Sequence, residues 1–250
     1  MELREFFEQH PRAVLGFSGG VDSSYLLYAG KKYGADIRPI FIKSVFQPDF
    51  ELEDARRLAE QVGAELTVIE VDVLQNQEVA ANPPDRCYYC KNGVFGRITA
   101  EAKALGYPLV IDGTNASDDE GDRPGMRALQ EMQVLSPLKI CGLRKEEIRQ
   151  LSREAGLFTW NKPSYACLAT RIETGVTITA ESLKRVEQGE AVLREMGFTD
   201  LRLRKRGENA WLQVPPEQME EAVRRREEIR IGVGPYFEKV LLDLEGRRSQ

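Results

Sequence analysis

The sequence predicts an α/β fold in which a Rossmann-like parallel sheet is followed by a smaller C-terminal α+β domain. Up to about residue 155, short apolar runs alternate with helix-length segments, as in a parallel sheet whose strands are joined by crossover helices. The texture changes after residue 171, where a long helical stretch precedes two adjacent strand-like runs and a highly charged segment. We therefore expect a first domain over residues 1–171 and a second over residues 172–250.

Apolar runs mark the strands of the first domain, and glycines mark the ends of several of its helices. Gly34, Gly106 and Gly156 each follow a helix-length segment. Residues 75–86 are polar and interrupted by prolines, so we expect a loop there. The expected elements are, in order, a helix over 2–9, a strand over 13–17, a helix over 23–33, a strand over 37–42, a helix over 49–62, a strand over 65–71, a helix over 92–105, a strand over 109–111 and a helix over 143–155.

The second domain begins with a long helical segment that Gly197 closes. Arg202 and Arg204 lie two positions apart on the strand that follows, so both side chains point to the same face. The expected elements are a helix over 180–196, strands over 201–206 and 210–214, a helix over 216–230 and a strand over 237–243.

The first strand runs directly into the glycine-rich string Ser18-Gly19-Gly20-Val21-Asp22-Ser23. Small residues let the backbone approach a ligand closely, and Asp22, Ser23 and Ser24 stand where N-cap residues belong, just before an apolar helical stretch. The free N–H groups of such a loop and the positive end of the helix dipole would converge on an anion. The string is neither a Walker-type loop nor Gly-x-Gly-x-x-Gly. An ordinary glycine-rich turn is the alternative.

Ligands of parallel sheets lie beyond the carboxyl ends of the strands. Ser44 follows the second strand, and the turn Asp112-Gly113-Thr114-Asn115 follows the fourth, so both share an edge with the loop at 18–24. Ser44 either lines a nucleotide pocket or only caps a turn.

Composition and charge exclude several classes of protein. The formal net charge is −5, which argues against a dedicated nucleic-acid binder. The sequence contains one histidine, which argues against a metal site built from histidines and against a Ser-His-Asp triad. No apolar stretch approaches the length of a membrane span, and the charged N-terminal residues lack the apolar centre of a signal peptide. We expect a cytoplasmic location.

Three of the four cysteines form a pattern that suits a metal centre in a reducing compartment. Cys87 and Cys90 are spaced C-x-x-C, and Cys167 follows much later. Zinc usually takes four ligands, whereas a [4Fe–4S] cluster on three cysteines leaves one iron open, so iron–sulfur fits better. A redox pair of the thioredoxin kind is a further alternative. Cys141 is a spectator, or a fourth ligand if the fold brings it near Cys167.

Several motifs recur together in one family. Besides the loop at 18–24, they are Cys87-Tyr88-Tyr89-Cys90-Lys91, Asp112-Gly113-Thr114-Asn115, Arg123-Pro124-Gly125, Ser136-Pro137-Leu138, Trp160-Asn161-Lys162-Pro163-Ser164, Cys167 and Arg171. Together they resemble the LarE family, ATP-dependent sulfur transferases of nickel-pincer nucleotide synthesis. The resemblance extends from about residue 10 to residue 243 and implies the PP-loop (adenine nucleotide alpha hydrolase-like) form of the Rossmann-like sheet.

The resemblance implies a two-step reaction on pyridinium-3,5-biscarboxylic acid mononucleotide. ATP with Mg²⁺ adenylates a carboxylate and pyrophosphate leaves; sulfur then displaces AMP to give a thiocarboxylate. Some members give up the sulfur of a single cysteine at the position of Cys167 and have no cysteines at the positions of Cys87 and Cys90. This sequence resembles the three-cysteine version, in which a cluster carries sulfur that sulfide or a persulfide donor supplies. Sacrificial use of Cys167 is the alternative.

Roles for single residues follow from the loop and from the same resemblance. We expect Asp22 and Lys91 to manage Mg²⁺ and the α-phosphate, and Glu190 matches an acidic position of the family's site. A structural salt bridge is the alternative for Asp22 and Lys91, and a solvated strand face for Arg202 and Arg204. The expected ATP-binding residues are Ser18, Gly19, Gly20, Asp22, Ser23, Ser24, Ser44, Gly113 and Asn115; the catalytic ones are Cys167, Asp22, Lys91 and Glu190; the substrate-binding ones are Arg171, Arg202 and Arg204; and the cluster ligands are Cys87, Cys90 and Cys167.

Other functions of this loop class remain open. A tRNA thiolation enzyme also joins such a loop to a three-cysteine cluster, a nucleotide-binding regulator could hold structural zinc, and an amide synthetase would leave the cysteines unexplained. The resemblance also implies a homo-oligomer, with a hexamer as one form.

Overall fold

The computed structural model describes residues 1–118 and 124–247, and their contacts divide the chain into two compact units. Each unit is assembled from separate pieces of the chain. We expected Cys167 and Arg171 in the first domain, whereas the contacts group both with unit 2. Unit 1 comprises Met1–Ser44, Asp49–Val73 and Asp85–Lys162, and unit 2 comprises Val45–Pro48, Leu74–Pro84 and Pro163–Gln250.

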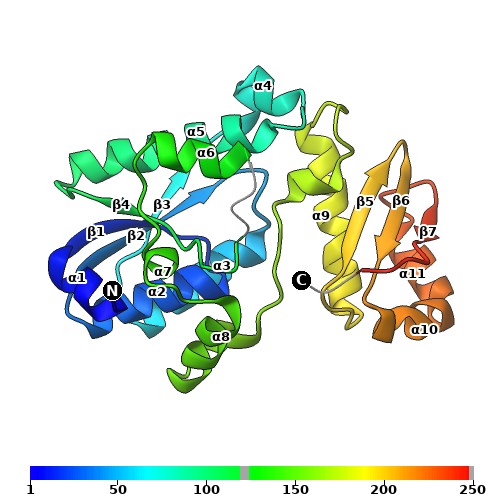
Figure 1. The fold of residues 1–250 in the computed structure, drawn as a ribbon. Coiled ribbons are helices and arrows are strands. Elements are labelled where there is room, and N and C mark those ends of the chain that lie inside the picture. The colour runs from blue at the N-terminus through cyan, green and yellow to red at the C-terminus, as the bar shows by residue number, and fades with distance from the viewer. Residues whose placement is uncertain (119–123, 248–250) are drawn as a thin grey trace. The chain divides into compact units, whose positions relative to one another are not determined.

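A four-stranded parallel sheet forms the centre of unit 1, with the strand order β3-β2-β1-β4 (Figure 1). This sheet, with its crossover helices, confirms the predicted fold class. Its strands are β1 (Arg12–Gly16), β2 (Asp36–Lys43), β3 (Thr67–Glu70) and β4 (Val110–Ile111). The helices of unit 1 are α1 (Leu3–Gln9), α2 (Val21–Lys32), α3 (Asp49–Gln61), α5 (Arg86–Ala104), α6 (Pro124–Glu131), α7 (Pro137–Ile140) and α8 (Lys145–Glu154).

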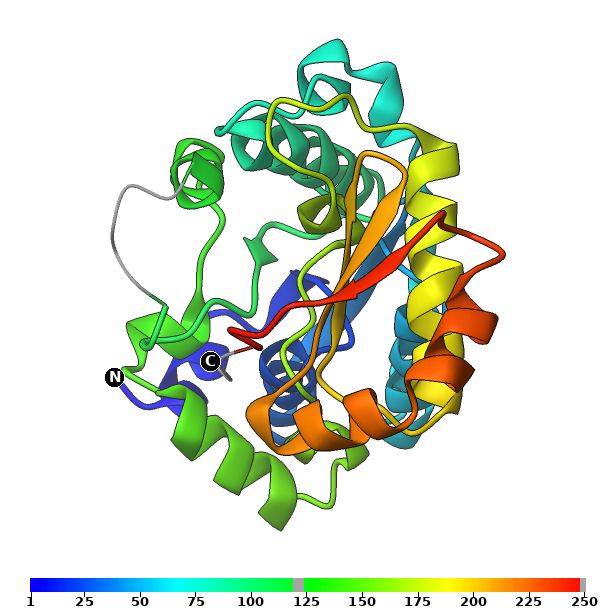
Figure 2. The same cartoon turned by 90° about the vertical axis from the view of Figure 1, so that its right-hand side faces the viewer.

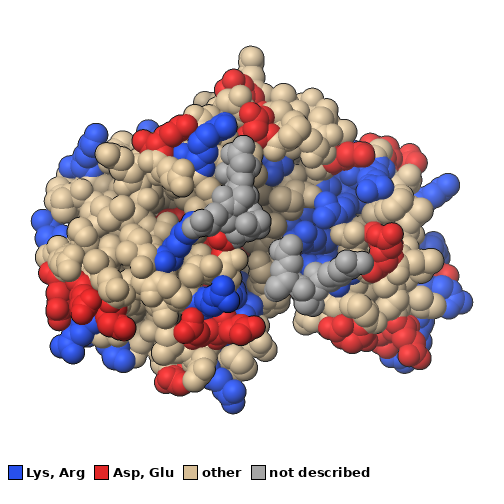
Figure 3. Space-filling view, viewed as in Figure 1, with Lys and Arg blue, Asp and Glu red and all other residues tan. Residues whose placement is uncertain are grey.

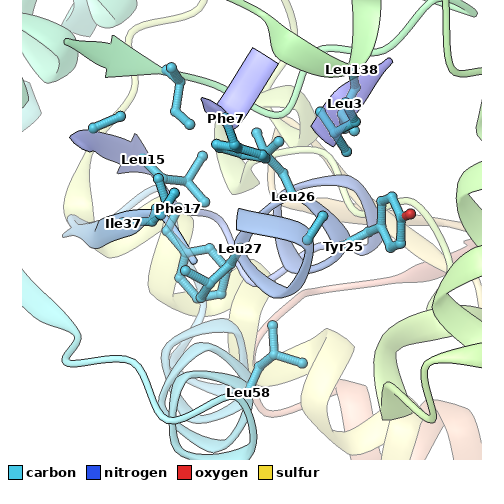
Figure 4. Packing of buried hydrophobic residues seen from close by; sticks show 14 of the residues in the cluster. Leu3, Phe7, Leu15, Phe17, Tyr25, Leu26, Leu27, Ile37, Leu58 and Leu138 are labelled. Atoms are coloured by element: carbon cyan, nitrogen blue, oxygen red, sulfur yellow. The ribbon is translucent and has the colours of Figure 1, made fainter. Parts of the chain in front are cut away.

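Helices cover both faces of this sheet because its strands are apolar on both sides. Successive residues of β1 alternate between two hydrophobic clusters: Leu15 packs with α1, α2 and α3, whereas Val14 packs with α5 and α6. Figure 4 shows the first cluster, with Phe7 of α1 and Leu26 of α2 beside Leu15. The buried faces fix β1 at the centre, so the loop that follows it lies at the middle of the sheet's carboxyl edge.

Two helix starts differ from the expectation. Helix α2 begins at Val21 with Gly20 as its N-cap, so Asp22, Ser23 and Ser24 lie in its first turn and do not cap it. Helix α5 begins at Arg86, before the expected start at residue 92, and therefore includes the cysteine pair. Apolar periodicity located the body of each helix but not its first turn.

Unit 2 contains a three-stranded sheet in the order β5-β6-β7, in which β5 and β6 are antiparallel and β6 and β7 are parallel (Figure 2). Leu203 and Leu212 are paired on β5 and β6 and are both buried. The predicted helix over 216–230 is wrong in one respect, since it divides at Arg225 into two helices. The elements are α9 (Ala180–Glu195), β5 (Arg202–Arg206), β6 (Asn209–Gln213), α10 (Pro216–Arg224), α11 (Arg226–Val233) and β7 (Val240–Leu242), with short helices η2 (Phe158–Asn161, in unit 1) and η3 (Leu168–Arg171) before them.

The segment Leu74–Pro84 joins unit 2 through Asn82, which is 1% exposed. The side-chain amide of Asn82 donates to the backbone carbonyls of Glu173 (2.8 Å) and Val176 (3.2 Å). The backbone carbonyl of Asn82 accepts from Gly175 N–H (2.8 Å). The expected loop over 75–86 also contains a short helix, α4 (Gln77–Ala80), capped by Asn76. Among the residues that the structure describes, no helix has the length and apolarity that crossing a membrane requires.

Candidate functional site

The loop between β1 and α2 is closed by its own hydroxyl groups. Ser18 Oγ lies 3.0 Å from Ser23 Oγ and accepts from Gly20 N–H (3.3 Å), and Ser23 Oγ also accepts from Ser18 N–H (3.4 Å). The N–H groups of Ser18 and Gly20 thus both point at the pair of serine hydroxyls at the start of α2. Phosphate oxygens can take the place of these hydroxyl acceptors, so the loop fits a pyrophosphate group.

Two glycines shape this loop by close approach. Gly19 has φ +67°, a left-handed conformation that favours glycine, and a Cβ there would lie 3.2 Å from the backbone of Ala55 on α3. Gly113, in the turn after β4, would place a Cβ 2.9 Å from Ser23 N. The Asp112–Asn115 turn therefore lies directly against the first turn of α2, as we expected from the shared edge.

Asp22 combines an ion pair with an unsatisfied oxygen. Its Oδ2 lies 2.5 Å from Lys145 Nζ at the first residue of α8, and its Oδ1 is buried with no hydrogen-bond partner. Burial raises the pKa of Asp22 above its ordinary value, although the charge of Lys145 opposes the rise. A buried carboxylate oxygen without a partner, beside a phosphate-binding loop, fits a hard cation such as Mg²⁺.

The turn after β4 is held by a buried carboxylate. Asp112 accepts from Ser136 Oγ (2.6 Å), Thr114 Oγ1 (2.6 Å) and Thr114 N–H (3.2 Å). Asn115 uses its side-chain oxygen locally, accepting from Ser117 N–H (2.8 Å). Asp112 and Ser136 thus stabilise the turn. Ser44, which is 7% exposed, is the last residue of the first piece of unit 1 and follows β2 at the same edge of the sheet.

The cysteine pair lies on the first turn of α5. Cys87 and Cys90 are three positions apart in a helix, so both thiols face the same side, and Cys87 is exposed. Arg86 Nη2 donates to Cys87 Sγ at 3.6 Å. This pair fits two ligands of one metal centre.

Lys91 lies one turn further along α5 and packs its methylene groups against α6. A Cβ built at Gly125 would lie 3.2 Å from Lys91 Cδ and 3.7 Å from Cys87 Cβ. The motif residue Arg123 lies outside the described residues. Management of the α-phosphate by Lys91 remains a prediction.

Cys167 belongs to unit 2, where it caps the short helix η3. Its carbonyl accepts from Thr170 N–H (3.0 Å) and Thr170 Oγ1 (2.9 Å). Among the described residues, no three His, Cys, Asp or Glu side chains form a metal-binding group. A cluster on Cys87, Cys90 and Cys167 remains a prediction.

A buried ion pair supports the segment that carries Cys167. The side chains of Arg171 and Glu190 are both 0% exposed, with Arg171 Nε 2.8 Å from Glu190 Oε1. Arg171 Nη1 donates to Ala166 O (2.7 Å), and Tyr165 Oη donates to Glu190 Oε2 (2.7 Å). We expected Arg171 to bind substrate and Glu190 to be catalytic; both side chains hold residues 165–171 on α9, and the two expected roles remain predictions.

We predict that Glu190→Ala lowers the free energy of unfolding by about 3–5 kcal/mol, because Arg171 would keep its charge in a buried site without its carboxylate. Urea unfolding followed by circular dichroism measures this. Glu208→Ala is the matched control, since that carboxylate also pairs with arginine but is exposed, and it should change stability little. Equal losses in the two variants would contradict the prediction.

Arginines gather on the face of the unit 2 sheet opposite Leu203, where Figure 3 shows basic side chains over β5. Arg202 and Arg204 share this face, as their spacing predicts. Arg204 Nε donates to Gln213 (2.9 Å), whereas Arg202 Nε is buried without a hydrogen-bond partner. Burial and the charge of Arg247 lower the pKa of Arg202 to about 10. An unsatisfied guanidinium among like charges fits a bound anion.

Comparisons with known proteins agree with this geometry. A family model described as queuosine biosynthesis protein QueC matches residues 12–82, which include the loop. An uncharacterized protein of Synechocystis sp. is 37% identical over 254 residues, covering 99% of this chain and 94% of that protein. The pyridinium-3,5-bisthiocarboxylic acid mononucleotide synthase of Lactiplantibacillus plantarum, a LarE protein, is 30% identical over 241 residues, covering 95% of this chain and 87% of its own length. The chain belongs to the LarE family.

More distant relatives include tRNA-specific 2-thiouridylases. The tRNA-specific 2-thiouridylase MnmA of Clostridium acetobutylicum is 25% identical over 224 residues, covering 74% of this chain and 63% of that protein. These relatives place the LarE chain among PP-loop enzymes, in agreement with the parallel sheet and the loop after β1.

Sequence reasoning missed four polar residues of the LarE fold described above. Lys145, Ser136 and Tyr165 act as partners of residues that we did predict, and Lys162 contacts the loop itself (3.3 Å from Nζ to Gly19 O). Ser136 and Lys162 belong to motifs shared with the LarE family, which was the only signal available for them. Lys145 had none, because its partner Asp22 is far away in the chain.

Proposed function

We propose that this protein is an ATP-dependent sulfur insertase that converts a carboxylate of pyridinium-3,5-biscarboxylic acid mononucleotide to a thiocarboxylate. The observation that carries the proposal is the loop at 18–24 with Asp22 in its first helical turn. The N–H groups of Ser18 and Gly20 point at the serine hydroxyls of this loop, where an anion would bind, and the unpartnered Asp22 Oδ1 belongs to the same loop. The relative in Lactiplantibacillus plantarum is named for a product of this kind.

The first step activates a poor electrophile. A carboxylate oxygen of the substrate attacks the α-phosphorus of ATP, a P–O bond forms, and the bond to pyrophosphate breaks. Negative charge develops on the departing pyrophosphate, where the loop amides and the dipole of α2 stabilise it. Asp22 would hold Mg²⁺ through Oδ1, and Lys91 is our candidate for the α-phosphate. The residues present therefore fit ATP and Mg²⁺.

In the second step a sulfur nucleophile attacks the acyl carbon, and AMP leaves with the former carboxylate oxygen. A [4Fe–4S] cluster on Cys87, Cys90 and Cys167, when bound, would supply sulfur at the oxidation level of sulfide, with sulfide as its source. The chain's own contribution is positional: Arg171 and Glu190 hold the Cys167 segment, and α5 presents Cys87 and Cys90 on one face.

Arg202 and Arg204 would bind the phosphate of the mononucleotide. The support is electrostatic, since the depressed pKa of each arginine reflects burial and like charges that a phosphate would relieve. Arg171, being fully paired, would act by placing the Cys167 segment beside them. We also propose a cytoplasmic homo-oligomer, by analogy with the family.

A tRNA thiolation activity is the second candidate, and the MnmA relatives favour it. The net charge of −5 argues against it, because RNA binding draws on a basic surface. Electrophoretic mobility shift with bulk tRNA distinguishes the two: tight, salt-sensitive binding would support the second candidate.

The deciding experiment is anaerobic turnover of the reconstituted protein with ATP, Mg²⁺, sulfide and the biscarboxylate mononucleotide. We expect pyrophosphate release coupled to thiocarboxylate, identified by mass spectrometry as an oxygen-to-sulfur exchange, with several thiolations per chain. One thiolation or fewer would support the sacrificial use of Cys167. Absence of pyrophosphate release in the complete mixture would refute the proposed function.

A further inference from the structure

Lys162 is the last residue of unit 1 in the sequence, and its side chain contacts the loop at 18–24. The proposed function gives this lysine no role. Its Nζ lies 3.3 Å from the carbonyl oxygen of Gly19 and 2.6 Å from Asp54 Oδ2 on α3. The ammonium also lies 5.5 Å from the ring centre of Phe50, and the side chain is only 14% exposed. A lysine fixed by three neighbours is not a solvated surface charge.

The backbone around Lys162 is fixed as well. Arg149 on α8 donates to Lys162 O (3.0 Å) and to Trp160 O (2.8 Å). The same helix begins with Lys145, which pairs with Asp22 in the loop. Helix α8 therefore contacts both the backbone of Lys162 and, through Lys145, the first turn of α2 that follows Gly19 and Gly20.

The contact with Gly19 O also determines where Gly20 N–H points. These two groups belong to one planar trans peptide, so the carbonyl and the N–H point in opposite directions. Gly19 has φ +67°, and with glycine on both sides of the peptide, steric hindrance to a flip is small. A flipped peptide would turn a carbonyl oxygen toward the anion and remove one donor.

We propose that Lys162 is a positioning residue that holds the Gly19–Gly20 peptide with its N–H facing into the loop, and thereby sets the affinity of the loop for the pyrophosphate part of ATP. The inference rests on the proposed function in one respect, namely that pyrophosphate is the group that binds this loop. Asp54 neutralises the ammonium at 2.6 Å, so Lys162 acts through the carbonyl and not as a phosphate ligand.

The test measures binding, not turnover. Isothermal titration calorimetry of the full chain with inorganic pyrophosphate and Mg²⁺, and separately with AMP, gives two dissociation constants. In Lys162→Met we expect pyrophosphate to bind about 10- to 100-fold more weakly, the usual effect of losing a hydrogen bond to a charged group. AMP lacks the pyrophosphate, so its dissociation constant should stay within about two-fold, well below that hydrogen-bond effect. Lys162→Arg keeps a donor and should recover most of the affinity.

Asp54→Asn is the matched control, because it removes the ion pair and leaves the lysine and the Gly19 carbonyl in place. We expect a smaller loss of pyrophosphate affinity than in Lys162→Met. An equal loss in both variants, or a parallel loss of AMP and pyrophosphate with a lowered melting temperature, would overturn the inference. A wild-type chain that binds neither ATP nor pyrophosphate would refute the proposed function itself, and the inference with it.

Discussion

Asp22→Asn is expected to lower ATP–pyrophosphate exchange by roughly 100-fold or more, the effect of removing one preorganised charge from a transition-state site. Asparagine keeps the size of the side chain but cannot balance the charge of Mg²⁺, and it leaves Lys145 without its carboxylate. The measurement is incorporation of labelled pyrophosphate into ATP in the presence of the biscarboxylate mononucleotide.

The same substitution should not destabilise the protein at neutral pH. Burial raises the pKa of Asp22, so the folded state binds a proton at this carboxyl more tightly than the unfolded chain does. The stability contributed by this group is therefore complete below the pKa of the unfolded chain and declines as the pH rises through the folded pKa. Asparagine cannot ionise, so it escapes this loss. A side chain that costs stability when ionised and is needed for activity fits a functional site.

Asp36→Asn provides the control for Asp22→Asn. Asp36 also pairs with a basic residue, Arg12, at 3.2 Å, but it begins β2 at the amino edge of the sheet. We expect exchange at the wild-type rate. Exchange by Asp22→Asn within two-fold of that control would refute the role of Asp22.

The second large effect concerns the cysteines. If a cluster carries the sulfur, Cys87→Ser, Cys90→Ser and Cys167→Ser should each lower thiolation by roughly 100-fold or more, because losing a ligand costs at least as much as losing its outer support. All three variants should keep ATP–pyrophosphate exchange, since the thiols take no part in adenylation. Thiocarboxylate formation and bound iron are the two readouts.

The pattern across variants separates the mechanisms. Sacrificial use of Cys167 predicts loss in Cys167→Ser alone, with Cys87→Ser and Cys90→Ser active. Cys141→Ser is the control for loss of a thiol, because Cys141 packs against the hydrophobic core of unit 1 and burial raises its pKa. Zinc without iron in the anaerobically purified protein, together with active Cys87→Ser, would rule out the cluster.

Local sequence predicted elements well where burial repeats with a regular period. The strands β1 and β2 lie within one residue of the expected bounds at each end, because their apolar runs pack against helices on both faces. The expected starts of α2 and α5 differ from the observed ones, because Gly20 caps α2 without a side chain and residues 87–90 at the start of α5 are not buried. The division of the last long helix at Arg225 also has no local signal in a uniformly charged stretch.

By itself the sequence determined the α/β class, the loop at 18–24, the cysteine pattern and the family, since each of these depends on neighbouring residues or on short motifs. Only the tertiary structure decided that Lys145 pairs with Asp22, that Lys162 contacts Gly19, and that Glu190 buries its charge against Arg171. The physical reason is the range of the interactions. Periodicity and glycine loops act within one element, whereas the pairing of a buried charge depends on which distant side chain the packed fold brings within hydrogen-bond distance.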